Sequence, residues 1–270
     1  MIPALVDTAE IPAETLASGV TVIPVLDVAG AAGGRLARRL VRVPAAGAYA
    51  GTAGPAGELW FVTSGSGRLE AGGTVAPVGP EHGIALPPGA VYRLTAEPVP
   101  RRSGVLIIDA VTLPEAGATL PAAGAAGSFA APRVTDLQDC AAEMTGDRRF
   151  RVLFGPGTGY PAATQFVGEI PPGRAPDHSH SYDEVVLILA GDGVVHLVAD
   201  EPAGEVRLTL AGQEAVWPGA VTYPLRPGSC LHLPPGQRHC LENTGTSMLR
   251  VLGVFHPGGS PAAKQPSPGT

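Results

Sequence analysis

The sequence carries an internal repeat of glycine and glutamate at a constant offset of 126 positions (173 − 47 for the first pair). The first-half positions are Gly47, Glu58, Gly65 and Gly67, and their second-half counterparts are Gly173, Glu184, Gly191 and Gly193. In each half an apolar run ends in a glycine turn and a second apolar run follows. Such runs are typical of short β-strands. The repeat therefore predicts two copies of one β unit.

Composition supports many short strands. The 270 residues include 37 glycines and 29 prolines, which interrupt the chain too often for long helices. A hydrophobic fraction of 44% is enough to fill a sizeable core. We therefore expect an all-β chain with residues 1–113 as a first domain, 114–149 as a linker, 150–256 as a second domain and 257–270 as a disordered tail. Within the linker, Thr135 to Thr145 is predicted to form a short helix, capped by Thr135 or Asp136 and ended by Gly146.

The two copies differ in length. Leu-Pro-Pro-Gly begins at Leu86 in the first copy and at Leu233 in the second, and the residue six positions after that leucine is Tyr92 or His239. Because Glu184 lies farther from His239 than Glu58 lies from Tyr92, the second copy holds an insertion. We place the insertion at 200–226, as an extra hairpin or a loop over the mouth of the second domain.

Charge and targeting features exclude several classes of function. The net charge is −6 and no dense block of basic residues is present, which argues against nucleic acid. Arg35, Arg38 and Arg39 are predicted to form a solvated strand face. No apolar run approaches the ~18 residues of a membrane span, and no secretion signal is visible. Three cysteines are too few for a disulfide framework, so we expect a cytoplasmic protein without membrane contact.

Two short blocks of the second copy carry the residues that suit a metal. Residues 173–184 contain His178, His180 and Glu184, and residues 228–239 end at His239. His178 and His180 can point to the same side of a strand, because side chains alternate along it. Three imidazoles and one carboxylate suit a divalent ion such as Fe, Mn, Co, Ni or Zn. We expect one such ion, with iron preferred, and two free positions in a six-coordinate geometry.

These two blocks resemble the two conserved motifs of the cupin superfamily. The first motif is matched by Gly173, His178, His180, Glu184 and Gly191, and the second by Gly228, Pro234, Gly236, His239 and Asn243. One residue fewer than usual separates Gly173 from the first histidine. The resemblance covers most of residues 20–112 and 150–256, and it implies two tandem cupin barrels of the double-stranded β-helix or jelly-roll type, a bicupin.

The resemblance also implies that the first barrel holds no metal. The positions of the three histidines are taken there by Thr52, Gly54 and Tyr92, and Glu58 alone remains of the four ligands. A single carboxylate cannot hold a transition metal usefully. We expect this barrel to contribute packing, dimer contacts or the shape of the pocket.

Six further residues near the blocks are candidates for the reaction. Tyr182 and His196 are predicted to act as acid, base or proton donor, and Arg174, Tyr223, Arg226 and His232 are predicted to contact substrate.

Cupins carry out many reactions, so the resemblance leaves the function open. Our first expectation is a non-haem Fe(II) dioxygenase-type oxidoreductase that acts on a small organic metabolite. A redox-neutral isomerase, decarboxylase or epimerase that uses the same site is the first alternative. A non-catalytic small-molecule sensor or binding protein is the second, and a structural zinc ion closed by four protein ligands is a further one. The expected partner is a small molecule, and a homodimer is compatible with the sequence.

Overall fold

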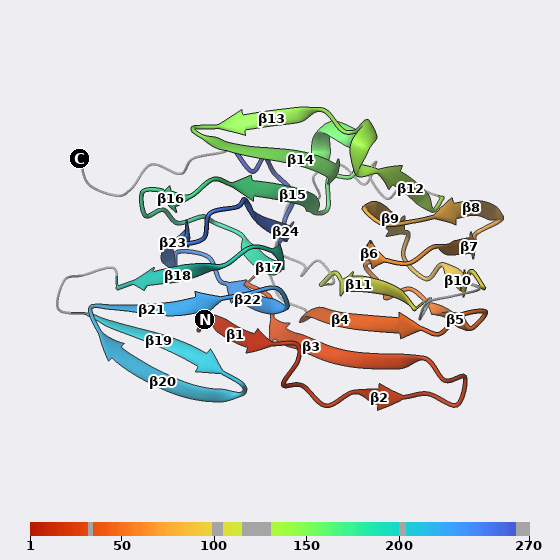
Figure 1. The fold of residues 1–270 in the computed structure, drawn as a ribbon, viewed down its shortest axis with the longest axis horizontal. Coiled ribbons are helices and arrows are strands. Elements are labelled where there is room, and N and C mark those ends of the chain that lie inside the picture. Colours follow the sequence, from red (N-terminus) through yellow and green to blue (C-terminus); the bar gives the residue numbers. More distant parts are fainter. Residues whose placement is uncertain (32–34, 99–104, 115–130, 200–203, 263–270) are drawn as a thin grey trace. The chain divides into compact units, whose positions relative to one another are not determined.

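The computed structural model describes residues 1–31, 35–98, 105–114, 131–199 and 204–262, and most of them lie in strands (Figure 1). The chain forms two compact units. The upstream unit contains Ile11–Ala141 and Leu153–Ala162, and the downstream unit contains Met1–Glu10, Ala142–Val152 and Ala163–Thr270. In the described part of the chain, no helix has the length and apolar character needed to cross a membrane.

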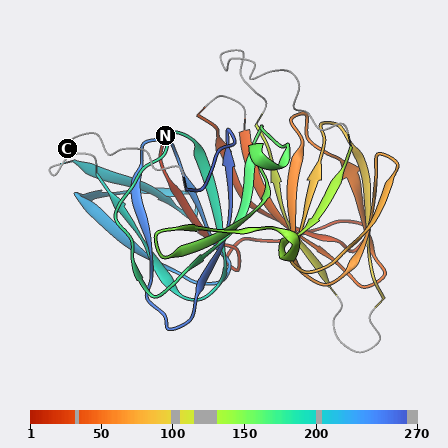
Figure 2. The same cartoon turned by 90° about the horizontal axis from the view of Figure 1, so that it is seen from above.

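The upstream unit consists of two antiparallel sheets that enclose an apolar interior (Figure 2). The larger sheet has the order β12-β9-β6-β11-β4-β3-β2 and the smaller has the order β5-β10-β7-β8. The strands are β2 (Glu14–Thr15), β3 (Thr21–Ala29), β4 (Arg35–Val43), β5 (Ala48–Thr52), β6 (Glu58–Ser64), β7 (Gly67–Ala71), β8 (Thr74–Val78), β9 (His82–Leu86), β10 (Val91–Ala96), β11 (Leu106–Thr112) and β12 (Arg133–Asp136). Alternating apolar side chains such as Trp60, Leu69 and Leu94 fill the space between the sheets.

The downstream unit repeats this arrangement with a nine-stranded and a four-stranded sheet. Their orders are β13-β14-β15-β24-β17-β22-β1-β19-β20 and β16-β23-β18-β21. The strands are β1 (Ala4–Asp7), β13 (Ala142–Thr145), β14 (Arg148–Phe154), β15 (Thr164–Ile170), β16 (Gly173–Arg174), β17 (Asp183–Ala190), β18 (Gly193–Val198), β19 (Glu205–Leu210), β20 (Gln213–Pro218), β21 (Ala220–Leu225), β22 (Ser229–Leu233), β23 (Arg238–Asn243) and β24 (Leu249–His256).

The two units match at the level of strand register, which confirms the predicted pair of all-β jelly-roll barrels. Glu58 on β6 pairs with Leu86 on β9, and Glu184 on β17 pairs with Leu233 on β22. Each of these central strands is followed by a glycine in the left-handed region, at φ +80° and +84°. A Cβ at Gly65 would approach the carbonyl oxygen of Val105 to 2.7 Å, and one at Gly191 would meet that of Met248 at the same distance. Both turns therefore require glycine.

The N-terminal strand and the insertion both belong to the downstream unit. β1 pairs antiparallel with β22 and parallel with β19, so the first ten residues leave the predicted first domain and join the second. β19 and β20 form the extra hairpin expected within 200–226, with a turn at Ala211 and Gly212. Residues 200–203 of the insertion lie outside the described residues.

The predicted linker is largely structured where it is described. Residues 115–130 lie outside the described residues, and β12 then pairs with the edge of β9. The helix expected over Thr135 to Thr145 is reduced to one turn, η1 (Leu137–Asp139), because strand pairing takes up the residues on both sides. Asp136 does cap this turn, accepting a hydrogen bond from the Gln138 amide at 2.8 Å. A second short turn, η2 (Pro156–Thr158), follows β14.

The segment predicted to be a disordered tail begins with an ordered stretch. The Thr164 hydroxyl donates to the carbonyl of Gly259 at 2.7 Å, and Ala262 packs against an aromatic cluster around Phe166. Residues 263–270 lie outside the described residues. Cys230 and Cys240 are buried.

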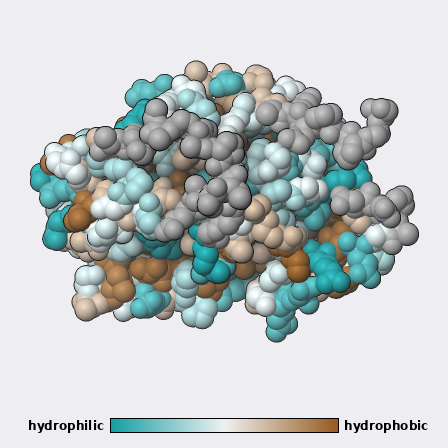
Figure 3. Space-filling view, turned by 180° about the vertical axis from the view of Figure 1, so that it is seen from behind, coloured by the Kyte–Doolittle hydropathy of each residue, from teal (hydrophilic) through white to brown (hydrophobic). Residues whose placement is uncertain are grey.

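The arginines of β4 are not a solvated face, contrary to our expectation. Arg35 is exposed, but Arg38 is buried and Arg39 is largely covered. Arg38 forms two parallel hydrogen bonds to Asp109 on β11, at 2.7 and 2.9 Å, with both side chains fully inaccessible. The prediction failed because both faces of β4 are covered and its carboxylate partners are distant in sequence. Most of the surface visible in Figure 3 is hydrophilic or neutral, and its hydrophobic residues occur in small groups.

The buried pair of Arg38 and Asp109 is expected to dominate the stability of the upstream unit. Asp109→Asn leaves a buried guanidinium without its counter-charge, which costs about 3–5 kcal/mol. Urea denaturation followed by circular dichroism measures the loss. Asp27→Asn is the matched control, because Asp27 pairs with Arg35 where both side chains are about 60% exposed, and such pairs contribute little. Equal stability of the two variants would contradict this assignment.

Candidate metal centre

Three side chains of the downstream unit converge on one point. His180, Glu184 and His239 each offer one donor atom, and these atoms lie within 4.8 Å of one another. Glu184 lies on β17, His239 lies on β23, and His180 lies in the loop that leads into β17. His180 and His239 are buried, while the Glu184 side chain keeps a small exposed surface.

Backbone hydrogen bonds hold the two motifs together. His178 and His239 exchange both of their backbone hydrogen bonds, at 2.9 and 2.8 Å. The Gly236 amide also donates to the carbonyl of His180 at 2.8 Å. Gly236 adopts φ +83°, which lets the chain turn tightly before β23. The position of the histidines is therefore fixed by the main chain, before any ligand binds.

Two carbonyl groups set the tautomers of the buried histidines. Nδ1 of His180 is 2.8 Å from the carbonyl of Tyr182, and Nδ1 of His239 is 2.8 Å from the carbonyl of Gln237. A carbonyl can only accept, so each Nδ1 donates to its carbonyl and each Nε2 is left for another partner. Burial, followed by the neighbouring His178 and His180, lowers the pKa of His239 to about 3. His239 is thus neutral near pH 7, the form that binds metals.

Nε2 of His180 has no hydrogen-bond partner by geometry among the residues that the structure describes. Its Nε2 is buried and lies 3.2 Å from Oε2 of Glu184, without hydrogen-bonding geometry. Burial acts to raise the pKa of Glu184, but the direct side-chain contact with His180, followed by the charges of the three histidines, lowers it overall, so the group is a carboxylate. A buried imidazole nitrogen and a carboxylate side by side can both act as donors to a cation that lies between them. The three donors therefore fit a divalent ion.

His178, the fourth predicted ligand, lies beside this group and is not part of it. The ring centroid of His178 is 4.5 Å from that of His239, and the His178 residue is exposed to solvent. Its Nδ1 is 3.5 Å from the Pro176 carbonyl, too far for a hydrogen bond that fixes the ring. The structure thus brings three of the four predicted ligands together and leaves the fourth within reach.

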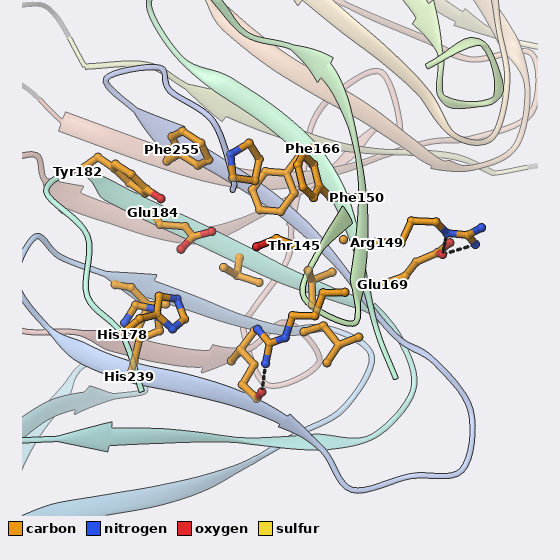
Figure 4. Close-up of a pocket in the computed structure, with 18 residues that line it drawn as sticks. Thr145, Arg149, Phe150, Phe166, Glu169, His178, Tyr182, Glu184, His239 and Phe255 are labelled. Atoms are coloured by element: carbon orange, nitrogen blue, oxygen red, sulfur yellow. Dashed lines mark hydrogen bonds and ion pairs between the residues drawn. The ribbon is translucent and has the colours of Figure 1, made fainter. Parts of the chain in front are cut away.

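A cavity of about 110 Å³ opens next to these donors. Figure 4 shows the two labelled histidines on one side of the Glu184 carboxylate and the rings of Phe150, Phe166 and Phe255 on the other. Leucine, isoleucine and valine side chains complete an apolar wall. The site can therefore exclude water from whatever binds beside Glu184.

Tyr182 is the predicted acid/base residue that lines this cavity. Its ring stacks on His180 at a centroid distance of 4.3 Å and an angle of 5°, and on Phe255 at 4.3 Å. Burial, followed by the charge of Glu184, raises the pKa of Tyr182, so its hydroxyl keeps its proton. Tyr182 can donate a hydrogen bond to a bound molecule.

Sequence reasoning missed two arginines of β14 that also line the cavity. Arg149 forms an ion pair with Glu169, with Nε 2.6 Å from Oε2. Arg148 donates from Nη2 to the carbonyl of Leu241 at 2.7 Å. The only available signal was their place in a strand, because Arg148 lies 25 residues before the first motif begins at Gly173 (173 − 148).

The remaining predicted residues do not line this cavity. His196 contacts Thr222 and Glu242 on the four-stranded sheet, with its Nε2 2.7 Å from Glu242. His232 is buried, with its Nε2 2.9 Å from Asp183. Arg174 is exposed and pairs with Asp177 at 3.0 Å.

Tyr223 and Arg226 lie apart from the metal centre, at a second, wider hollow of the downstream unit. Arg226 pairs there with Asp7, its Nε 2.6 Å from Oδ2. The insertion therefore contributes to a different surface from the one we expected it to cover.

In the upstream unit, the carboxylate of Glu58 is paired with the guanidinium of Arg39. Nη2 of Arg39 is 2.6 Å from Oε2 of Glu58, and the Trp60 indole also donates to that oxygen at 2.6 Å. The Gly54 amide approaches the other carboxylate oxygen at 3.2 Å. Within the described residues of this unit, no group of histidine, cysteine and acidic side chains suits a metal.

Comparison with known proteins agrees with this fold. Residues 200–255 match the family described as Cupin domain. No curated protein sequence matches the chain. Many solved structures do match.

Three solved structures illustrate the likeness. The oxalate decarboxylase of Lactobacillus farciminis in complex with formate has a TM-score of 0.67 and 13% identity, covering 94% of this chain and 86% of that chain. A structure of the Bacillus subtilis oxalate decarboxylase, studied for its Mn(II) centres, has a TM-score of 0.69 and 14% identity, covering 95% and 78%. Protein Ylba from E. coli has a TM-score of 0.66 and 11% identity, covering 94% and 90%.

Identities this low show the fold and leave the reaction open. The fold is nevertheless the one that the two motifs imply, and the matched segment contains His239. The family match over residues 200–255 and the two-barrel fold of the similar structures thus agree with the resemblance that the two motifs show.

Proposed function

We propose that the protein is a metal-dependent enzyme that binds one divalent ion in the downstream barrel and acts on a small organic molecule. The observation that supports this most strongly is the buried Nε2 of His180, which faces Glu184 without a hydrogen-bond partner among the described residues. His239 supplies a second neutral imidazole. His178 is proposed as a fourth ligand that completes the shell by rotating its ring.

The open cavity favours catalysis over a structural ion. A structural zinc site is closed by its four ligands, whereas this group of donors faces a cavity of about 110 Å³. A bound divalent ion would supply Lewis-acid stabilisation of negative charge on a substrate oxygen. The phenyl rings exclude water, and Tyr182 holds a proton that it can donate to the bound molecule.

A redox-neutral reaction, such as decarboxylation or isomerisation, is the chemistry we propose. It fits a site that combines a Lewis acid with a proton donor, and two of the similar structures are oxalate decarboxylases. Manganese is accordingly the ion we propose, in place of the iron expected from the sequence. The Fe(II) dioxygenase remains the second candidate, because an apolar cavity beside the metal also suits O₂.

Removal of one buried imidazole should abolish metal binding. His239→Ala is expected to lower metal affinity by more than the roughly 10- to 100-fold that loss of an outer hydrogen-bond partner costs. His178→Ala should lose less, because His178 lies outside the compact group. Metal per chain after dialysis, determined by mass spectrometry, measures both effects.

His196→Ala is the matched control for these variants. His196 lies on β18, next to β23, but contacts Glu242 and not the metal centre. It should keep the metal content of the unmodified protein. Full metal retention by His239→Ala, with the fold intact by circular dichroism, would overturn the proposed site.

The proposed chemistry predicts turnover without oxygen. Protein loaded with Mn(II) should convert its substrate in an anaerobic chamber at the same rate as in air, and an oxygen electrode should record no substrate-dependent uptake. A panel of 2-oxo, 2-hydroxy and dicarboxylic acids provides the substrates, with product formation followed by NMR. Oxygen uptake in proportion to product, or turnover with iron alone, would favour the dioxygenase instead. Binding without turnover would favour the sensor or binding protein.

A further inference from the structure

Arg148 lines the metal cavity without a carboxylate of its own. Its Nη2 donates to the carbonyl of Leu241 at 2.7 Å, and no ion pair with another described residue involves it. Its neighbour Arg149, by contrast, is neutralised by Glu169. Burial, the largest effect, lowers the pKa of Arg148, but a guanidinium remains charged in proteins. A cation without an ion pair among the described residues therefore borders the cavity, with Asp147, its neighbour in sequence, as a carboxylate that acts on it from a greater distance.

The charges around the cavity favour an anion. Among the described residues that line it, the carboxylates are Glu184 and Glu169. Glu184 would share its charge with a +2 ion, and Glu169 is paired with Arg149. The metal centre and Arg148 thus leave excess positive charge on the cavity that both of them line. A carboxylate can bind an arginine through two parallel hydrogen bonds.

The opposite side of the cavity is mainly apolar. Phe150, Phe166 and Phe255 form it, and Figure 4 shows their rings gathered away from the histidines. A second carboxylate placed against these rings would lose its hydration and meet neutral hydroxyl groups, those of Tyr182 and Thr145, without a positive charge to balance it. The cavity volume of about 110 Å³ compares with about 150 Å³ for a site that holds benzene. A short tail fits, and a sugar does not.

From these contacts we infer that Arg148 binds the carboxylate of the substrate, and that the substrate is a small monocarboxylic acid with a short apolar tail. This inference rests on the proposed metal-dependent function. An oxygen next to the carboxylate, as in a 2-oxo or 2-hydroxy acid, would face the metal centre. The tail would lie on the phenyl rings. Arg148 thus takes the role that the sequence suggested for Arg174.

Calorimetric titration of the Mn(II)-loaded protein with three probes tests the inference. 2-Oxopentanoate carries both the carboxylate and the tail, hexane-2,3-dione replaces the carboxylate by a neutral group, and oxalate replaces the tail by a second carboxylate. We expect 2-oxopentanoate to bind about 10- to 100-fold more tightly than hexane-2,3-dione, the effect of a charge-assisted hydrogen-bonded pair. We also expect it to bind more tightly than oxalate.

Variants test whether the preference for 2-oxopentanoate over hexane-2,3-dione depends on the Arg148 side chain. Arg148→Gln should weaken 2-oxopentanoate by the same factor and leave hexane-2,3-dione unchanged, and Arg148→Lys should recover part of the loss. Arg174→Gln, the matched control, should bind all three probes like the unmodified protein, because Arg174 does not line the cavity. The comparison of probes on unmodified protein stands even if Arg148→Gln folds poorly.

The outcomes separate this inference from the proposed function. Failure of the unmodified protein to take up Mn(II) would refute the metal site itself. Uptake of metal with no binding of 2-oxopentanoate would overturn the inference alone, as would equal binding of acid and dione. A loss caused by Arg174→Gln and not by Arg148→Gln, or tighter binding of oxalate, would overturn it as well.

Discussion

The downstream site depends on the two-way backbone pairing of His178 with His239. This pairing joins the two motifs, and the hydrogen bond from Gly236 to His180 strengthens the junction. It places His180 and His239 so that carbonyls occupy both Nδ1 atoms and one donor atom of each ring lies within 4.8 Å of the Glu184 carboxylate. Since the main chain carries the geometry, the donors are preorganised and little ordering remains for metal binding.

The two barrels stabilise a buried glutamate with different partners. Each buries a glutamate at the same point of the central strand, paired in register with a leucine. A buried carboxylate needs a partner of opposite charge. Arg39 provides it for Glu58 in the upstream barrel, with the Trp60 indole as a second donor. In the downstream barrel, histidines and an open cavity surround Glu184, and we propose a metal ion as its partner.

The fold could be predicted from the sequence because glycine turns and motif spacing are local signals. Gly65 and Gly191 adopt backbone angles that other residues avoid, so glycine is required at both positions and the repeat is visible in the sequence. Contacts between residues that are distant in the chain produce no comparable local pattern in the sequence. The pairing of β1 with β22 and the position of Arg148 in the cavity depend on sheet order, which spacing does not encode. The helix predicted near Thr135 failed for the same reason.

The central claim is that one cation occupies the space between His180, Glu184 and His239. Anomalous diffraction from crystals of the metal-loaded protein, recorded on both sides of the absorption edge of the metal, tests it most directly. The account predicts one peak per chain, bonded to Nε2 of both buried histidines and to the Glu184 carboxylate. A peak beside Glu58, or none within bonding distance of His180 and His239, would contradict it.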